Sequence, residues 1–130
     1  PLMNPLTESY ANVMLALCLW REARGESFEG QLAIAHVIRS RAKDKRWPDT
    51  IPGVILQRWQ FSSFNANDPN ATKFPDESKA DWMSCCRAAV SAMADPTSGA
   101  NHYHTTAVHP KWADTSKITA RIGNHVFYRL

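Results

Sequence analysis

The chain has 130 residues, of which 44% are hydrophobic and 21% are charged, and its formal net charge is +3. These proportions are typical of a folded domain and exclude an intrinsically disordered chain. The longest apolar run, residues 13–20, is much shorter than the roughly 20 residues that cross a bilayer, which excludes stable membrane insertion. We therefore predict a single domain over residues 1–130, acting as a monomer.

Apolar residues at helical spacing predict two helices in the first third of the chain. The first extends from Thr7 to Arg24 and is followed by Gly25, a residue suited to a left-handed helix cap. Ser27 is placed to cap the second helix, whose apolar pattern ends near Trp47 and Pro48. The two helices should therefore meet at a tight corner over residues 25–27.

The middle of the chain predicts two further helices separated by a loop. A short third helix covers residues 51–57, with Pro52 in its first turn. Residues 59–74 are rich in turn-forming residues and predict a loop around a short extended segment at 60–62. The helical pattern returns over residues 76–94, which predicts a fourth helix.

The C-terminal third has the alternating pattern of strands. Residues 100–104 are predicted to be extended, and residues 118–122 and 125–129 flank a two-residue Gly123–Asn124 hairpin turn. The fold class is therefore predicted to be α+β, mainly α, with a small antiparallel sheet near the C-terminus.

Glu22 is the strongest candidate for chemistry, because apolar side chains precede it at helical spacing near the end of the first helix. Desolvation and the negative end of the helix dipole both raise the pKa of such a carboxyl, so that it keeps a proton to deliver. The alternative is a structural ion pair with a neighbouring arginine. Gly25 is expected to turn Glu26 and Glu29 toward solvent.

Metal, cofactor and nucleic-acid binding are not indicated. The three cysteines lack a Cys-x-x-Cys spacing and are interpreted as reduced, buried thiols, while His102, His104 and His109 lack a further ligand nearby. The basic cluster at residues 39–46 has no interleaved aromatic residues and is interpreted as a solvated helix end. We therefore predict no metal, no cofactor and no nucleic-acid partner.

Four ordered blocks resemble the cell wall hydrolases related to spore-cortex-lytic enzymes. The first block starts with Glu-Ala-Arg-Gly-Glu at residues 22–26 and continues through residues 28–41. The others are Gln-Phe-Ser at 60–62, Asp-Pro-Thr-Ser-Gly-Ala at 95–100, and Ile-Gly-Asn-His-Val-Phe-Tyr at 122–128. The resemblance covers roughly residues 10–130 and departs from the family at residues 102–106 and 65–70.

This resemblance implies a lysozyme-like fold and cleavage of peptidoglycan glycan strands between N-acetylmuramic acid and N-acetylglucosamine. The first glutamate of the Glu-Ala-Arg-Gly-Glu run is the general acid in that family, which here is Glu22. The family favours the lytic transglycosylase reaction, in which one glutamate acts as acid and then as base. A hydrolytic muramidase needs a second carboxylate, for which Glu26, Glu29 and Asp68 stay open.

Sugar-binding grooves combine flat apolar faces with amide and hydroxyl groups, and several residues of the matched blocks supply them. Trp112 is a possible platform for a sugar ring, although Trp112 and Phe127 are as well suited to the core and Phe61 better suited. His125 is expected to orient a residue of the groove. The predicted substrate-binding residues are Glu26, Gln60, Ser62, Tyr103, His104, Trp112, His125 and Tyr128.

Three other functions are weighed against glycan cleavage: a zinc amidase, a non-catalytic wall-binding module and, last, a nucleic-acid binder. The expected partner is the peptidoglycan glycan strand, which places the site of action at the bacterial cell wall, in the periplasm or outside the cell. No signal peptide is recognised, and a phage endolysin made in the host cytoplasm is one origin consistent with that.

Overall fold

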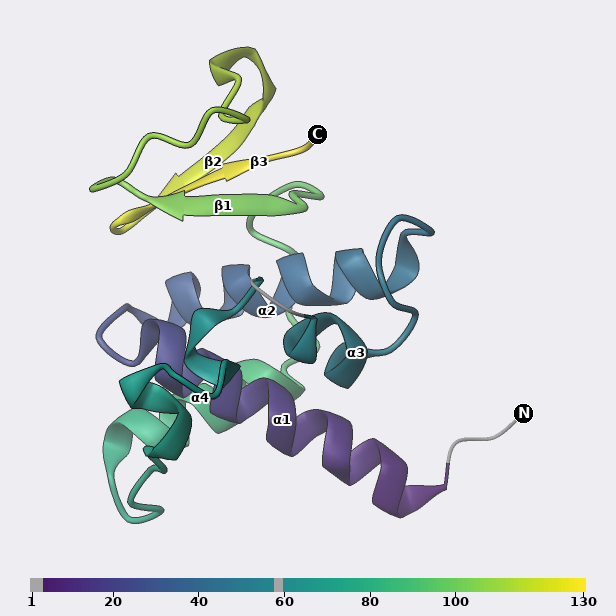
Figure 1. Ribbon diagram of the computed structural model, residues 1–130, viewed down its shortest axis with the longest axis vertical. Helices are drawn as coiled ribbons and strands as arrows, with labels where there is room; N and C mark the ends of the chain where they lie inside the picture. Colours follow the sequence, from purple (N-terminus) through teal and green to yellow (C-terminus); the bar gives the residue numbers. More distant parts are fainter. Residues whose placement is uncertain (1–3, 58–59) are drawn as a thin grey trace.

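The computed structural model describes residues 4–57 and 60–130. A helical body carries a small sheet on one side (Figure 1), and α2 lies between that sheet and the other helices. The α-helices are α1 (Pro5–Ala23), α2 (Phe28–Lys43), α3 (Ile51–Leu56) and α4 (Ala80–Val90). The predicted fold class, mainly helical with a small antiparallel sheet, is confirmed.

The sheet has the order β1-β3-β2, built from β1 (His102–Thr105), β2 (Ile118–Ile122) and β3 (His125–Tyr128), all antiparallel. The hairpin between β2 and β3 turns at Gly123, as predicted, with a φ of +55°. The positive φ favours glycine at this position, and a Cβ there would lie 2.9 Å from Glu26 Oε1 and displace the end of that side chain. Because β3 is central, all four of its residues are buried.

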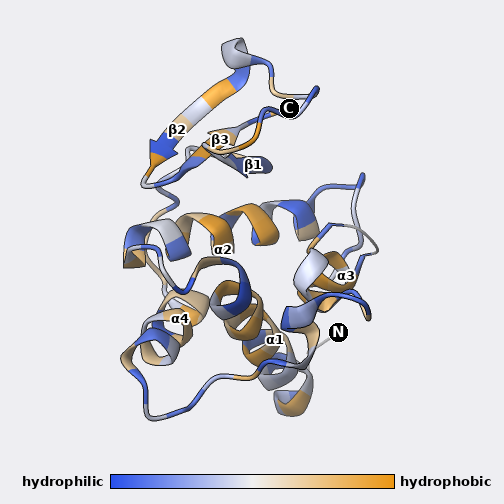
Figure 2. Ribbon diagram, turned by 60° about the vertical axis from the view of Figure 1, so that its left-hand side comes forward, coloured by the Kyte–Doolittle hydropathy of each residue, from blue (hydrophilic) through white to orange (hydrophobic). Residues whose placement is uncertain are grey.

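The core lies where α1, α2, α3 and α4 meet, and it continues to the face of the sheet that covers α2. Figure 2 shows the apolar stretches of α1 and α2 facing one another, with polar loops around them. Nine of the 16 residues of α2 are buried, because both the sheet and the helices cover it. The three cysteines are free thiols, and Cys86 is only partly buried.

The end of α1 differs from the prediction. The C-cap residue Arg24 is right-handed, with a φ of −61°, and Gly25 does not adopt the left-handed conformation. Gln31 takes over the role of the cap, because its buried Nε2 donates to the carbonyls of Ala23 and Glu26. Carbonyls at the helix end are thus satisfied from α2, while Ser27 caps α2 as predicted.

Three predicted segments differ from the structure. The fourth helix is shorter, since Asp76 Oδ1 accepts from the backbone and hydroxyl of Ser78 and holds a turn before α4 begins. The second helix ends at Lys43, several residues before Trp47. Instead of an extended segment at 60–62, a 3-10 helix covers Ser62–Phe64, and a second one covers Pro69–Thr72.

Candidate active site

Glu22 is the penultimate residue of α1 and is partly buried. Burial raises the pKa of its carboxyl, the nearby Ser63 hydroxyl lowers it, and the negative charge of Asp68 raises it further, with a net rise. The surroundings of Glu22 thus favour the protonated, neutral form of its carboxyl over the ionised form.

No cation pairs with Glu22 among the residues that the structure describes. Arg24 instead donates to the Trp20 carbonyl and lies over the Trp20 ring. Arg21 binds backbone carbonyls of the following loop. A structural ion pair of Glu22 with Arg21 or Arg24, the alternative interpretation, is therefore not formed.

Glu22 faces a cavity of about 470 Å³ at the β1 edge of the sheet. The volume is large enough for a sugar residue, and the walls mix aromatic with polar side chains. The cavity is lined by Glu22, Arg41, Gln60, Phe61, His102, Tyr103 and Trp112.

Tyr103 connects the sheet to Glu22. Burial raises the pKa of its hydroxyl well above the usual value, and the negative charge of Glu22 raises it further, so the phenol stays protonated as a hydrogen-bond donor. Its ring packs edge-on against His125, with centroids 5.3 Å apart. The expected orienting role of His125 stays a prediction, and this ring contact is the one through which it would act on Tyr103.

Arg21 holds the loop that follows the cavity residues Gln60 and Phe61. Its guanidinium makes four hydrogen bonds to three carbonyls, those of Ser63, Ala71 and Lys73. It also lies over the rings of Phe64 and Phe74, at 4.6 and 5.0 Å from their centroids. These contacts draw residues 62–74 back onto α1.

The loop brings Ser63, and not the predicted Ser62, to Glu22. Ser62 is exposed, whereas Ser63 is buried and its Oγ lies beside the carboxyl without a well-formed hydrogen bond. A 3-10 helix turns successive side chains through about 120°, which sends neighbouring serines in different directions.

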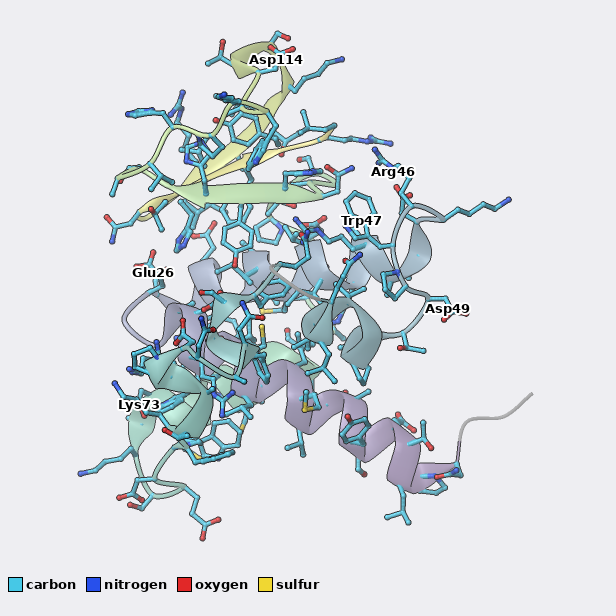
Figure 3. The ribbon with its side chains drawn as sticks, in the orientation of Figure 1. Glu26, Arg46, Trp47, Asp49, Lys73 and Asp114 are labelled. Carbon is cyan, nitrogen blue, oxygen red and sulfur yellow. The ribbon has the colours of Figure 1, made fainter. Side chains whose placement is uncertain are left out.

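Glu26 is directed to the hairpin, not to solvent as expected. Its carboxylate accepts from the backbone and side chain of Asn124 and from His125 Nδ1 at 3.1 Å. Figure 3 shows Glu26 at the corner between α1 and α2, below the hairpin. Burial raises the pKa of Glu26, but these hydrogen bonds outweigh it and lower the pKa. Neither Glu26 nor His125 lines the cavity.

Three predicted binding residues form an aromatic cluster on the outer face of the sheet. His104 Nε2 is 2.7 Å from the Tyr128 hydroxyl, and both rings pack against Trp112. Trp112 is 39% exposed and lines the Glu22 cavity, so it is no core residue, unlike Phe61 and Phe127. His104 and Tyr128 line a separate cavity of about 310 Å³.

Sequence patterns missed Arg41 and His102 as cavity residues. Arg41 was assigned to a solvated helix end, yet only 6% of it is exposed, whereas Lys43, Lys45 and Arg46 are exposed. A signal existed, since Arg41 lies one helical turn after the buried Val37. His102 alternates with Tyr103 along β1, and the edge position of that strand lets both reach the cavity.

Residues 4–57 and 60–130 contain no group of three histidine, cysteine, aspartate or glutamate side chains arranged to hold a metal ion. In the same residues, no helix has the length and apolar character needed to cross a membrane.

Comparisons with known proteins all match this chain to enzymes that act on the cell wall or the spore cortex. The profile of a family described as Cell Wall Hydrolase matches residues 25–128. Spore cortex-lytic enzymes from Halalkalibacterium halodurans and Bacillus subtilis are 32% and 33% identical over 117 and 118 residues, 88% of this chain in each case. The chain spans 33% and 36% of the length of these two relatives.

Two solved structures match nearly the whole fold. The catalytic domain of the germination-specific lytic transglycosylase SleB from Bacillus anthracis superposes with a TM-score of 0.75 at 28% identity, covering 98% of this chain and all of that one. The catalytic domain of the Bacillus cereus SleB protein gives a TM-score of 0.69 at 27% identity, covering 92% and 91%. Glu22 precedes the range that the family profile matches.

Proposed function

Because the chain belongs to the cell wall hydrolase family, we propose that it cleaves peptidoglycan glycan strands between N-acetylmuramic acid and N-acetylglucosamine, with Glu22 as the general acid. One observation carries the proposal: Glu22 is a partly buried carboxyl with a raised pKa and no cationic partner among the described residues, at a cavity of sugar-ring size. The likeness to a lytic transglycosylase domain supports the substrate class.

The first step is protonation of the glycosidic oxygen by Glu22, which allows the bond from that oxygen to the muramic anomeric carbon to break. Positive charge then develops at the anomeric carbon, and the Glu22 carboxylate left behind stabilises it electrostatically. Tyr103 and Gln60 offer hydrogen bonds to sugar oxygens, and the exposed face of Trp112 offers an apolar surface to the ring.

The second step favours transglycosylation. The 6-hydroxyl of the same muramic residue attacks the anomeric carbon and returns its proton to Glu22, which closes a 1,6-anhydro ring without water. One carboxyl is sufficient for this reaction, and Glu22 is the only carboxyl that lines the cavity among the described residues. Glu29 is exposed and Glu26 is bound to the hairpin. Asp68 influences the Glu22 pKa and is the remaining candidate for a hydrolytic second carboxylate.

Mass spectrometry of digested peptidoglycan tests the reaction. Anhydro-muramic ends are expected and would support the transglycosylase route, whereas reducing muramic ends would show hydrolysis. Release of free peptides without glycan cleavage would show an amidase, and wall binding without any product would show a non-catalytic module. Either of the last two results would overturn the proposal.

The pH profile gives a second test, through Ser63→Ala. A general acid works in its protonated form, so kcat/KM should fall as pH rises through the pKa of Glu22. The Ser63 hydroxyl lowers that pKa, so its removal should move the basic limb of the profile to higher pH. The matched control is Ser62→Ala, because Ser62 is the adjacent residue but is exposed. An unchanged profile in Ser63→Ala would contradict the assignment of that limb to Glu22.

A further inference from the structure

Arg41 is a buried cation in the same cavity as Glu22. It lies in the last turn of α2, only 6% exposed. Its Nε donates to the Asn101 carbonyl at 2.8 Å, and its Nη1 donates to Gln60 Oε1 at 3.3 Å. Among the described residues, Nη2 has no hydrogen-bond acceptor, which leaves one side of the guanidinium available to a ligand.

The charge of Arg41 is also not compensated. No carboxylate lies within ion-pair distance in residues 4–57 and 60–130. Burial lowers the pKa of Arg41, but a guanidinium stays protonated in proteins. Burying an unpaired charge is unfavourable, so such a group at a cavity wall is a candidate anion site.

His102 carries no charge that could offset the positive charge of Arg41. Its pKa is lowered to about 4, first by burial and then by the charges of Arg41 and Arg46, so the ring is neutral near pH 7. Its Nδ1 lies 2.8 Å from Asn101 Oδ1, which holds the ring beside the guanidinium. The neighbouring phenol of Tyr103 is likewise neutral.

Arg41 and Glu22 line the same cavity but come from different helices, α2 and α1. Tyr103, which also lines the cavity, is influenced by both charges, because Glu22 raises the pKa of its hydroxyl and Arg41 lowers it. No carboxylate of the described residues pairs with Arg41, so an anion that binds there does not have to displace Glu22 from the guanidinium.

The guanidinium is also held in a fixed plane. The Trp47 and Phe61 ring centroids lie 5.3 and 6.0 Å from its central carbon. Trp47 lies between the end of α2 and the sheet (Figure 3). Aromatic faces and two hydrogen bonds restrict the side chain, which favours the directed, paired hydrogen bonds that arginine forms with a carboxylate.

We propose that Arg41 determines specificity by binding a carboxylate of the glycan strand's muramic residue or of its attached peptide. The inference rests on the proposed function and adds to it, because N-acetylglucosamine carries no carboxylate. Binding of this anion would distinguish the two alternating sugars and set which linkage meets Glu22. The carboxylate has two sources: the lactyl group of a muramic residue without peptide, and the peptide itself.

The test compares native peptidoglycan with peptidoglycan whose carboxylates have been converted to amides. For the unmodified protein, amidation should lower kcat/KM about 10- to 100-fold, the loss typical of a charged hydrogen bond. For Arg41→Gln the two substrates should be cleaved at similar rates. The two kcat/KM values, on native and on amidated peptidoglycan, are measured with the same variant. A smaller fraction of folded protein lowers both values equally and leaves their ratio unchanged. Arg39→Gln is the matched control, since Arg39 bonds to the Ala89 carbonyl, away from the cavity, and should retain the wild-type ratio.

Peptide-free glycan strands identify the source of the carboxylate. If the lactyl carboxylate is bound, strands stripped of peptide should be cleaved and should lose rate on amidation; if the peptide is bound, stripping alone should lower kcat/KM.

If Arg41→Gln does not fold, inhibition of the unmodified protein decides: N-acetylmuramic acid or a muramyl peptide should inhibit at lower concentration than its amide. An equal effect of amidation on the unmodified protein and on Arg41→Gln, or equal inhibition by acid and amide, would overturn the inference while glycan cleavage stands. Absence of any glycan cleavage by the unmodified protein would overturn both.

Discussion

Glu22→Gln should lose at least about 100-fold in kcat on peptidoglycan, because glutamine matches the shape of glutamate but cannot deliver a proton. The fold should be retained and its stability near pH 7 should not fall. A carboxyl whose pKa is raised by folding favours the folded state most at low pH, and that contribution is lost as pH rises through the folded pKa. The neutral amide of glutamine has no ionised form, so its burial does not cost the free energy that burial of the ionised carboxylate costs at higher pH.

Release of soluble wall fragments and urea unfolding at pH 7 are the two measurements. Glu26→Gln is the informative comparison, because Glu26 holds the hairpin through Asn124 and His125 and does not line the cavity. The pKa of Glu26 is lowered in the folded protein, so its ion contributes stability that is present above the unfolded pKa and is lost as pH falls. Glu26→Gln should therefore destabilise the protein at pH 7. Full turnover by Glu22→Gln would rule out Glu22 as the acid.

Arg21→Met should lower the free energy of unfolding by about 2–4 kcal/mol, since four hydrogen bonds from a charged donor to loop carbonyls are lost. Methionine fills much of the volume, so the missing hydrogen bonds dominate the effect. The loop should loosen, and activity should fall, because the loop carries Ser63 and directly follows the cavity residue Phe61.

Urea denaturation with an activity assay in parallel measures both effects. Arg87→Met is the control, because Arg87 is exposed on α4 and makes no side-chain hydrogen bond within the described residues, and it should change stability by less than about 0.5 kcal/mol. If Arg21→Met were as stable as this control, the loop would be held by other contacts and the positioning role of Arg21 would be wrong.

Local patterns predicted the elements because the forces that form them act over a few residues. The hairpin at Gly123 was located correctly, since a tight turn there requires a residue that tolerates positive φ. Ser27 was recognised as a cap for the same local reason. The fourth helix was predicted too long because Asp76 forms a turn with Ser78 that periodicity does not register.

The candidate site was predicted only in part. Glu22 followed from its position on an apolar helix face and from the family resemblance. Ser63 was missed in favour of Ser62, because the sequence does not show the 3-10 helix that separates their directions or the hydrogen bond from Arg21 to the Ser63 carbonyl. Arg41 was missed because a basic residue near a helix end is usually solvated, whereas here Phe61 and Asn101, far along the chain, contact its guanidinium.

Local sequence patterns and the family resemblance were enough to predict most of the helices and strands, the family, and Glu22 as the candidate acid. The polar groups that surround Glu22, and their charges, depend on the tertiary structure. Arg21 reaches a carbonyl 52 residues away and Glu26 binds a histidine 99 residues away. Such contacts leave no periodic trace in the chain, because they depend on where packing of the whole core brings each side chain and how far it excludes water.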